Sequence, residues 1–232
     1  MQDDRASLIA PPSSRRHAAL PAEYDARQVG ASAALPCGGT WPRAALLLLV
    51  LTLLAGCGHR LTPPANVSNP VPVYVVDYGR HASLALPSRD AETLSEWSWG
   101  DWNWFALEET GVLQGFEALF ASRGATLSRR TIAPADSPAD IQRRLGAEEV
   151  LALEVERSRA AALEAQLETR WHSRRAEAVT GTGVRIFVPD EGRYSVGNNS
   201  VHELNRWLRT LGVEVDGSGV VARYRVVGEG RE

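Results

Sequence analysis

Between residues 73 and 227, apolar and polar positions follow the patterns of short strands and amphipathic helices. Runs that are rich in β-branched residues, or that alternate between apolar and polar, predict strands at residues 73–76, 81–86, 126–132, 149–155, 185–188 and 220–227. Apolar residues three and four positions apart predict helices at residues 110–122, 158–172 and 199–211. Because strands and helices interleave without a regular strand–helix–strand repeat, the pattern predicts an α+β domain.

An uncharged apolar run at residues 44–56 stands between Arg43 and Cys57. The run is too short to cross a bilayer core of about 30 Å as a helix, but it has the length of a signal-peptide core. The motif Leu-Ala-Gly-Cys at residues 54–57 resembles the processing site of bacterial lipoproteins. This resemblance implies cleavage before Cys57, lipidation of Cys57 and a mature chain that begins there. A short buried helix followed by a chance Cys is the alternative interpretation.

These features predict three parts in the chain. We expect residues 1–56 to be a leader and signal peptide, residues 57–72 to be the lipidated Cys and a tether rich in Pro, Asn and Ser, and residues 73–232 to be the folded domain. The expected location is the cell envelope, with the membrane bound through the lipid on Cys57. Gly58 stands where an Asp would favour retention at the inner membrane, so resemblance to Gram-negative lipoproteins implies the periplasmic face of the outer membrane.

Charge and cysteine content exclude several classes of function. The segment after Cys57 holds 20 Arg against 24 acidic residues, and this balance argues against nucleic acid as a partner, because nucleic-acid binding requires clustered cations. Cys37 lies in the leader and Cys57 at the anchor, so the mature domain has no thiol for a disulfide or a Cys-based metal site. The sequence has no Gly-rich phosphate loop and no metal-ligand spacing, so we expect no cofactor, and we expect a monomer.

Three segments together resemble a known family. They contain Arg-His-Ala-Ser at residues 80–83, Trp-Gly-Asp at residues 99–101, and Asn-Asn-Ser at residues 198–200 followed by Leu-Arg-Thr-Leu-Gly at residues 208–212. In this order and spacing they resemble DUF2459, a family of uncharacterised bacterial proteins, over roughly residues 71–215. That family is itself similar to circularly permuted papain-like domains of the NlpC/P60 type. The resemblance implies an antiparallel sheet packed with helices, and a site in which a His at a strand start faces a Cys at a helix N-terminus.

By this resemblance His81 takes the place of the family His, and Ser200 takes the place of the Cys. A Cys–His pair can rest as thiolate and imidazolium, whereas a Ser hydroxyl stays neutral near pH 7 and needs the base to remove its proton during attack. The exchange therefore favours a degenerate domain that binds a ligand with little or no activity. The alternative is an amide or ester hydrolase or acyltransferase that acts on cell-envelope material, with Ser200 as nucleophile and His81 as base.

Each candidate residue also has a structural interpretation. Ser200 is a favourable helix N-cap, His81 could be an exposed loop residue, and Asp101 could either orient His81 or form the turn after Gly100. The aromatic cluster could be core, or it could be a platform for a sugar or cell-wall ligand, because aromatic faces stack on sugars. The residues expected to line a cleft are Trp99, Trp102, Trp104, Tyr194 and Asn199.

Overall fold

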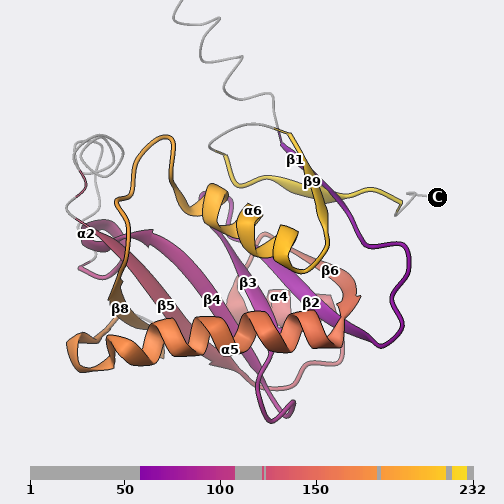
Figure 1. Ribbon diagram of the computed structural model, residues 1–232, viewed down its shortest axis with the longest axis horizontal. Helices are drawn as coiled ribbons and strands as arrows, with labels where there is room; N and C mark the ends of the chain where they lie inside the picture. The colour runs from indigo at the N-terminus through magenta and orange to yellow at the C-terminus, as the bar shows by residue number, and fades with distance from the viewer. Residues whose placement is uncertain (1–57, 108–121, 123, 182–183, 218–220, 229–232) are drawn as a thin grey trace, which may run out of the picture. The chain divides into compact units, whose positions relative to one another are not determined.

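A seven-stranded sheet organises the computed structural model, which describes residues 58–107, 122, 124–181, 184–217 and 221–228 (Figure 1). The strand order is β6-β2-β3-β4-β5-β8-β7, and each neighbouring pair is antiparallel. The strands are β2 (Pro70–Asp77), β3 (Ala82–Pro87), β4 (Leu94–Asp101), β5 (Ala125–Ile132), β6 (Glu149–Glu156), β7 (Val179–Thr180) and β8 (Ile186–Asp190).

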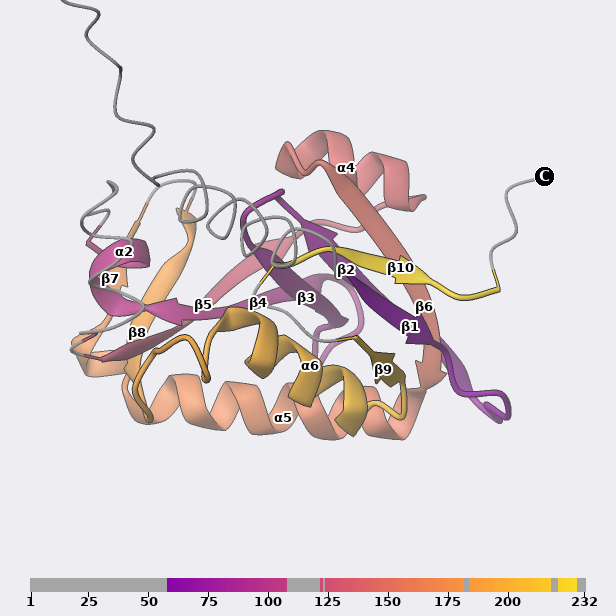
Figure 2. The same ribbon diagram turned by 90° about the horizontal axis from the view of Figure 1, so that it is seen from above.

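Helices cover the two faces of this sheet unequally. Figure 2 shows α5 (Arg157–Ser173) and α6 (Ser200–Thr210) on one face and α4 (Pro138–Leu145) on the other. Two other helical segments in the described part of the chain are short: α2 (Trp102–Phe105) follows β4, and the 3-10 turn η1 (Arg175–Glu177) follows α5. The expected α+β class is thus confirmed.

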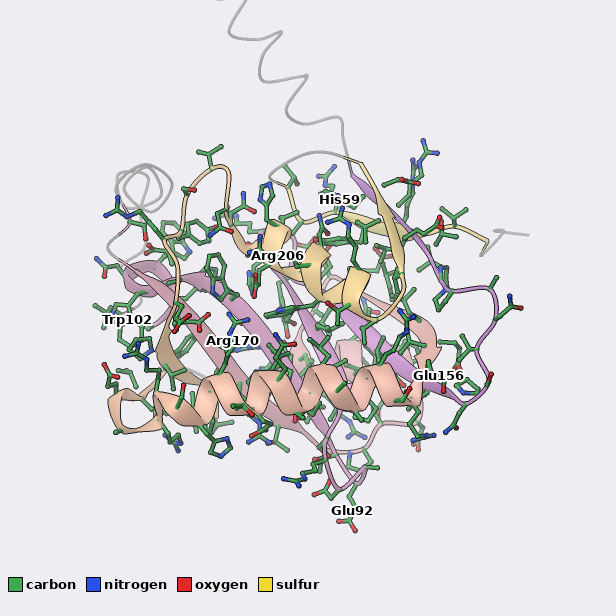
Figure 3. The ribbon with its side chains drawn as sticks, viewed as in Figure 1. His59, Glu92, Trp102, Glu156, Arg170 and Arg206 are labelled. Atoms are coloured by element: carbon green, nitrogen blue, oxygen red, sulfur yellow. The ribbon has the colours of Figure 1, made fainter. Side chains whose placement is uncertain are left out.

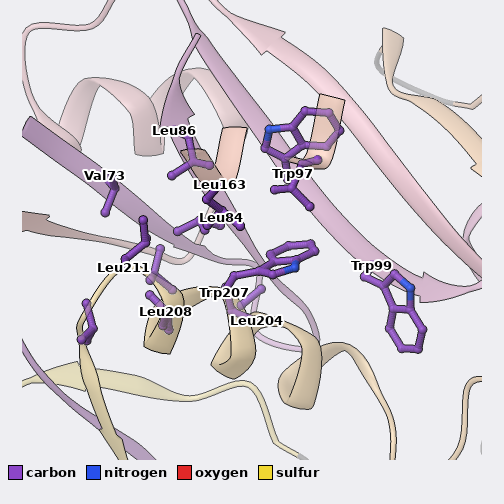
Figure 4. Close-up of a cluster of buried hydrophobic side chains, with 14 of the residues drawn as sticks. Val73, Leu84, Leu86, Trp97, Trp99, Leu163, Leu204, Trp207, Leu208 and Leu211 are labelled. Atoms are coloured by element: carbon purple, nitrogen blue, oxygen red, sulfur yellow. The ribbon is translucent and has the colours of Figure 1, made fainter. Parts of the chain in front are cut away.

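The main core lies between the sheet and the pair α5 and α6. Figure 4 shows Trp97 of β4 and Trp207 of α6 among the aliphatic side chains of this layer. Arg170 of α5 points toward α6, where its guanidinium is 2.8 Å from the Glu203 carboxylate (Figure 3). A smaller cluster under α4 contains Ile141 and Val76.

A second, three-stranded sheet corrects the expected tether. β1 (His59–Thr62) pairs in parallel with β10 (Tyr224–Val226) and antiparallel with β9 (Glu214–Asp216). The Leu61 side chain is fully buried in the main core. Because β1 pairs with two other strands and Leu61 packs in the core, the described part of residues 57–72 belongs to the fold and is not a free linker.

Most of the other predicted elements match the structure. The strands expected at residues 73–76 and 149–155 lie within β2 and β6, and the helix expected at residues 158–172 lies within α5. The predicted helix at residues 110–122 falls outside the described residues except for Ser122, and so do Cys57 and the leader. Among the helices of the described residues, none is long and apolar enough to cross a membrane.

Candidate functional site

His81 stands at the start of β3, against the ring of Phe105 at the end of α2, with ring centroids 4.8 Å apart. Gly100 makes room for this contact, since a Cβ there would lie 2.2 Å from the Phe105 ring. Both ring nitrogens of His81 are buried and have no hydrogen-bond partner in the described part of the chain. The pKa of His81 is lowered to about 4, chiefly by burial and also by the Arg185 guanidinium, which together outweigh the opposing effect of Glu96. The imidazole is therefore neutral at pH 7.

Ser200 is the first residue of α6, but it does not cap the helix. The cap is Asn199, whose Oδ1 accepts hydrogen bonds from the backbone N–H groups of Val201 (3.0 Å) and His202 (3.3 Å). The structure thus gives Asn199 the N-cap role that the sequence had suggested for Ser200. The Tyr194 hydroxyl adjoins Ser200, whose hydroxyl and backbone N–H oppose the rise that burial causes in the pKa of Tyr194.

His81 and Ser200 reach the same end of the sheet on opposite faces. β3 and β4 are antiparallel, so β3 begins where β4 ends, and Ser200 is tied to that end through Tyr194, which stacks on Trp99 at 5.6 Å. Alternation along β3 puts His81 on the face of Ser83, whereas α6 covers the other face. The His81–Ser200 hydrogen bond that the hydrolase alternative requires is not formed between these two described side chains. Catalysis by this pair stays a prediction.

A thiol at position 200 tests the pair directly. In a chain carrying Cys37→Ser and Cys57→Ser, the pH dependence of iodoacetamide alkylation of Ser200→Cys should be unchanged by His81→Ala, because His81 is neutral and faces away. Tyr194→Phe serves as the contrast, since it removes the hydroxyl that Ser200 contacts and should shift the thiol pKa. A thiol pKa that rises when His81 alone is lost would restore the hydrolase hypothesis.

Asp101 acts as a helix cap in the structure. Its Oδ1 accepts the backbone N–H of Trp104 at 2.9 Å, and its Oδ2 accepts the Ser122 hydroxyl. These contacts occupy the carboxylate, and it makes no hydrogen bond to the His81 ring. Asp101 therefore stabilises the turn from β4 into α2.

The tryptophans divide between the core and α2. Trp97 and Trp99 are buried, and their indole N–H groups donate to Glu164 (2.6 Å) and Asp190 (2.8 Å). Trp102 and Trp104 are half-buried on α2 (Figure 3 labels Trp102). The core interpretation thus fits Trp99.

A buried ionic cluster, which sequence reasoning missed, lies beside His81. Glu96 of β4 is fully buried and accepts hydrogen bonds from the hydroxyls of Tyr78 (2.7 Å) and Ser83 (2.6 Å). Arg130 and Arg185 pair with its two oxygens at 2.7 and 2.6 Å. Burial alone would raise the pKa of Glu96, but the two guanidinium groups outweigh it and lower the pKa to about 2. With both oxygens paired, Glu96 has a structural role.

A pocket of about 1260 Å³ runs along α5 on the face that α6 does not cover. Its walls are α5, the turn at residues 88–93 between β3 and β4, and part of β5. This turn, which carries Glu92, extends past α5 in Figure 3. Small apolar residues form part of the lining, among polar and charged ones: Pro87, Ala91, Ala160, Ala161 and Ala165.

Glu164 gives this pocket its chemistry. The residue is 3% exposed, and its Oε2 accepts the Trp97 indole N–H, while its Oε1 is buried and has no hydrogen-bond partner among the described residues. Burial raises the pKa of Glu164 to about 7, although Ser95 and Trp97 stabilise the charged form. A carboxyl that titrates near neutral pH in a pocket marks a candidate binding site.

The nearest cation in the pocket is already paired. Arg129 of β5 lies 2.8 Å from the Glu168 carboxylate and stacks over the rings of Trp97 and Trp171, with its guanidinium carbon 5.8 and 5.6 Å from their centroids. Arg129 does not form an ion pair with Glu164 in the structure. Among the described residues, Glu164 is thus a buried carboxyl of this pocket that forms no ion pair.

Comparison of the chain with protein-family models, curated proteins and solved structures gave no match. The geometry and chemistry of the described residues are therefore the basis for a functional proposal.

Proposed function

We propose that the protein is a lipid-anchored module of the bacterial envelope that binds a small ligand in the pocket along α5. The observation that carries this proposal is a pocket of about 1260 Å³ with the buried, incompletely paired carboxyl of Glu164 in its wall. Ligand sites are typically concave, mostly apolar and equipped with a few polar groups, and this pocket has all three properties. A neutral His81 that faces away from Ser200 supports binding over hydrolysis.

We further propose that the domain is a degenerate, permuted papain-like fold related to DUF2459. The ordered motifs around His81 and Ser200 support the relationship. It is also supported by the packing of α6 across β3 and β4, with the N-terminus of α6 at the end of the sheet where β3 begins. In this proposal the arrangement of sheet and helices is retained, whereas the ligand binds on the side of α5 that α6 does not cover.

The proposed anchor would hold the domain close to its membrane, on the periplasmic face of the outer membrane. Only Gly58 separates Cys57 from the first residue of β1, His59, which is buried. Two residues of chain span at most about 7 Å. The small sheet that contains β1 would then lie next to the lipid headgroups.

Nile red, a neutral apolar dye, tests whether the pocket binds ligands. Ala161 lines the pocket, and Ala162 is exposed on the same helix outside it, so Ala161→Trp and Ala162→Trp form a matched pair. We expect Ala161→Trp to weaken dye binding about tenfold, because the indole would fill the groove, and Ala162→Trp to leave it unchanged. Fluorescence titration gives both affinities, and circular dichroism checks the fold. Equal loss in both variants, or no dye binding to the original chain, would contradict the proposal.

A further inference from the structure

We propose that the ligand of this pocket is an amphiphile with a primary ammonium group, which donates to Oε1 of Glu164 while its apolar chain lies along α5. This inference rests on the proposed function, and it adds the chemical class of the ligand. It follows from three features of the pocket as the described residues form it: an oxygen without a donor, a carboxylate without an ion pair, and an apolar path along α5.

The first feature is the unpaired oxygen. A buried polar atom without a partner costs about 1–3 kcal/mol, and more when the group is charged. Oε1 of Glu164 is such an atom within the described structure, while Oε2 is already bonded to Trp97. An oxygen of an ionised carboxylate can only accept, so its missing partner must be a donor.

The second feature is the charge balance around Glu164. On α5 itself, Glu168 forms an ion pair with Arg129 and lies 3.0 Å from the ring of His172, and Arg157 at the helix start hydrogen-bonds to Asn69. The facing turn between β3 and β4 contributes one charge of each sign, Arg89 and Asp90. From β4 the contacts are neutral, the Trp97 indole and the Ser95 hydroxyl. Because Arg129 is neutralised by Glu168, a ligand cation would meet Glu164 without displacing an existing ion pair.

The third feature is the apolar path beside Glu164. Ala160 and Ala161 precede it by one helical turn, Ala165 follows it, and Pro87 and Ala91 face them across the groove. Small side chains leave room for an alkyl chain, and burial of each CH₂ group contributes about 0.8 kcal/mol. A ligand with its polar head at Glu164 and its alkyl tail along these alanines would use both the carboxylate and the apolar path.

Proton linkage gives the proposal a second signature. Burial raises the pKa of Glu164 to about 7, and a bound ammonium would stabilise the carboxylate and lower this pKa. Binding between pH 6 and 7 should therefore release a proton. A neutral ligand of the same length would have a much smaller effect.

The experiment compares three probes of equal chain length, octylamine, 1-octanol and octanoate, by isothermal titration calorimetry. The protein is the full chain with Cys57→Ser, which prevents acylation. At pH 8 the Glu164 carboxyl is ionised, and octylamine should bind about tenfold more tightly than 1-octanol. Glu164→Gln, which keeps the shape of the side chain, should abolish this preference. Glu154→Gln, at an exposed position of β6, is the matched control and should preserve it.

Measurements on the unaltered binding site keep the proposal testable if Glu164→Gln does not fold. At pH 5.5 Glu164 is protonated while octylamine keeps its charge, so octylamine should bind at least tenfold more weakly than at pH 8, with 1-octanol unchanged. Equal affinities for octylamine and 1-octanol at pH 8, or tightest binding of octanoate, would overturn the ammonium assignment and leave the pocket in place. Failure of all three probes to bind would instead contradict the proposed function itself.

Discussion

Replacement of Glu96 with Gln is expected to lower the free energy of unfolding by about 3–5 kcal/mol, a large part of the stability of an ordinary domain. The Arg130 and Arg185 side chains are only 18% and 13% exposed, and their positive charges are compensated by the Glu96 carboxylate. A neutral amide would leave two largely buried cations unpaired. With the amide oxygen retained for the hydroxyls of Tyr78 and Ser83, which both donate to Oε1, the NH₂ group would face the guanidinium of Arg130, donor against donor.

Urea denaturation followed by tryptophan fluorescence measures this loss. Glu92→Gln is the control, because Glu92 is exposed in the turn between β3 and β4 and should change stability by less than about 0.5 kcal/mol. If the two variants unfold at the same urea concentration, the cluster around Glu96 does not have the structural role assigned to it.

The cluster around Glu96 is also expected to determine how the free energy of unfolding falls at acid pH. The pKa of Glu96 is lowered to about 2, so its contribution is present above the unfolded value near 4.5 and is lost as the pH falls toward 2. His81 acts in the same direction, because its pKa of about 4 lies below the unfolded value of 6.5, and its contribution is lost between pH 6.5 and 4. Glu164 acts oppositely: its pKa is raised to about 7, so its contribution is present below pH 4.5 and is lost as the pH rises through 7.

Periodicity predicted the α+β class because the segments that form the core show helical or strand spacing of apolar residues within their own sequence. The apolar stripe of α5 and the β-branched run of β2 are both readable within a few residues. The apolar pattern did not predict α4, because only one of its eight residues, Ile141, is buried. β4 did carry a strand signal, since Trp97 and Trp99 alternate with Glu96 and Ser98, but the tryptophans were interpreted as an aromatic cluster.

The candidate site was harder to predict because its chemistry depends on distant contacts. The structure places His81 and Ser200 at the same end of the sheet but on opposite faces. Successive side chains of a strand, however, point to opposite faces of the sheet. Sequence alone therefore does not show whether a given side chain lies on the face that a particular helix covers. Glu164 did offer a local signal, since it adjoins the apolar stripe of α5. Its role still depends on Trp97, which lies 67 positions earlier in the sequence.

The second large effect concerns β1, the segment that composition had indicated as a tether. Leu61→Ala is expected to lower the free energy of unfolding by about 2–5 kcal/mol, because it removes a fully buried side chain from the core and leaves a cavity. A tether would tolerate this change without loss. Residues 63–72, just after Leu61, are rich in Pro, Asn and Ser, and this composition concealed a strand of four residues whose partners, β9 and β10, come from the far end of the chain.

Arg60→Ala provides the matched control one residue away. Arg60 is exposed on the same strand, so its removal should change stability by less than about 0.5 kcal/mol. A large loss in Leu61→Ala with none in Arg60→Ala would show that the fold begins within four residues of Cys57. The proposed lipid anchor would then hold the domain against the headgroups, with little freedom to reorient. Equal behaviour of the two variants would mean that β1 contributes nothing to the core, and the domain could then reach ligands at a distance from its membrane.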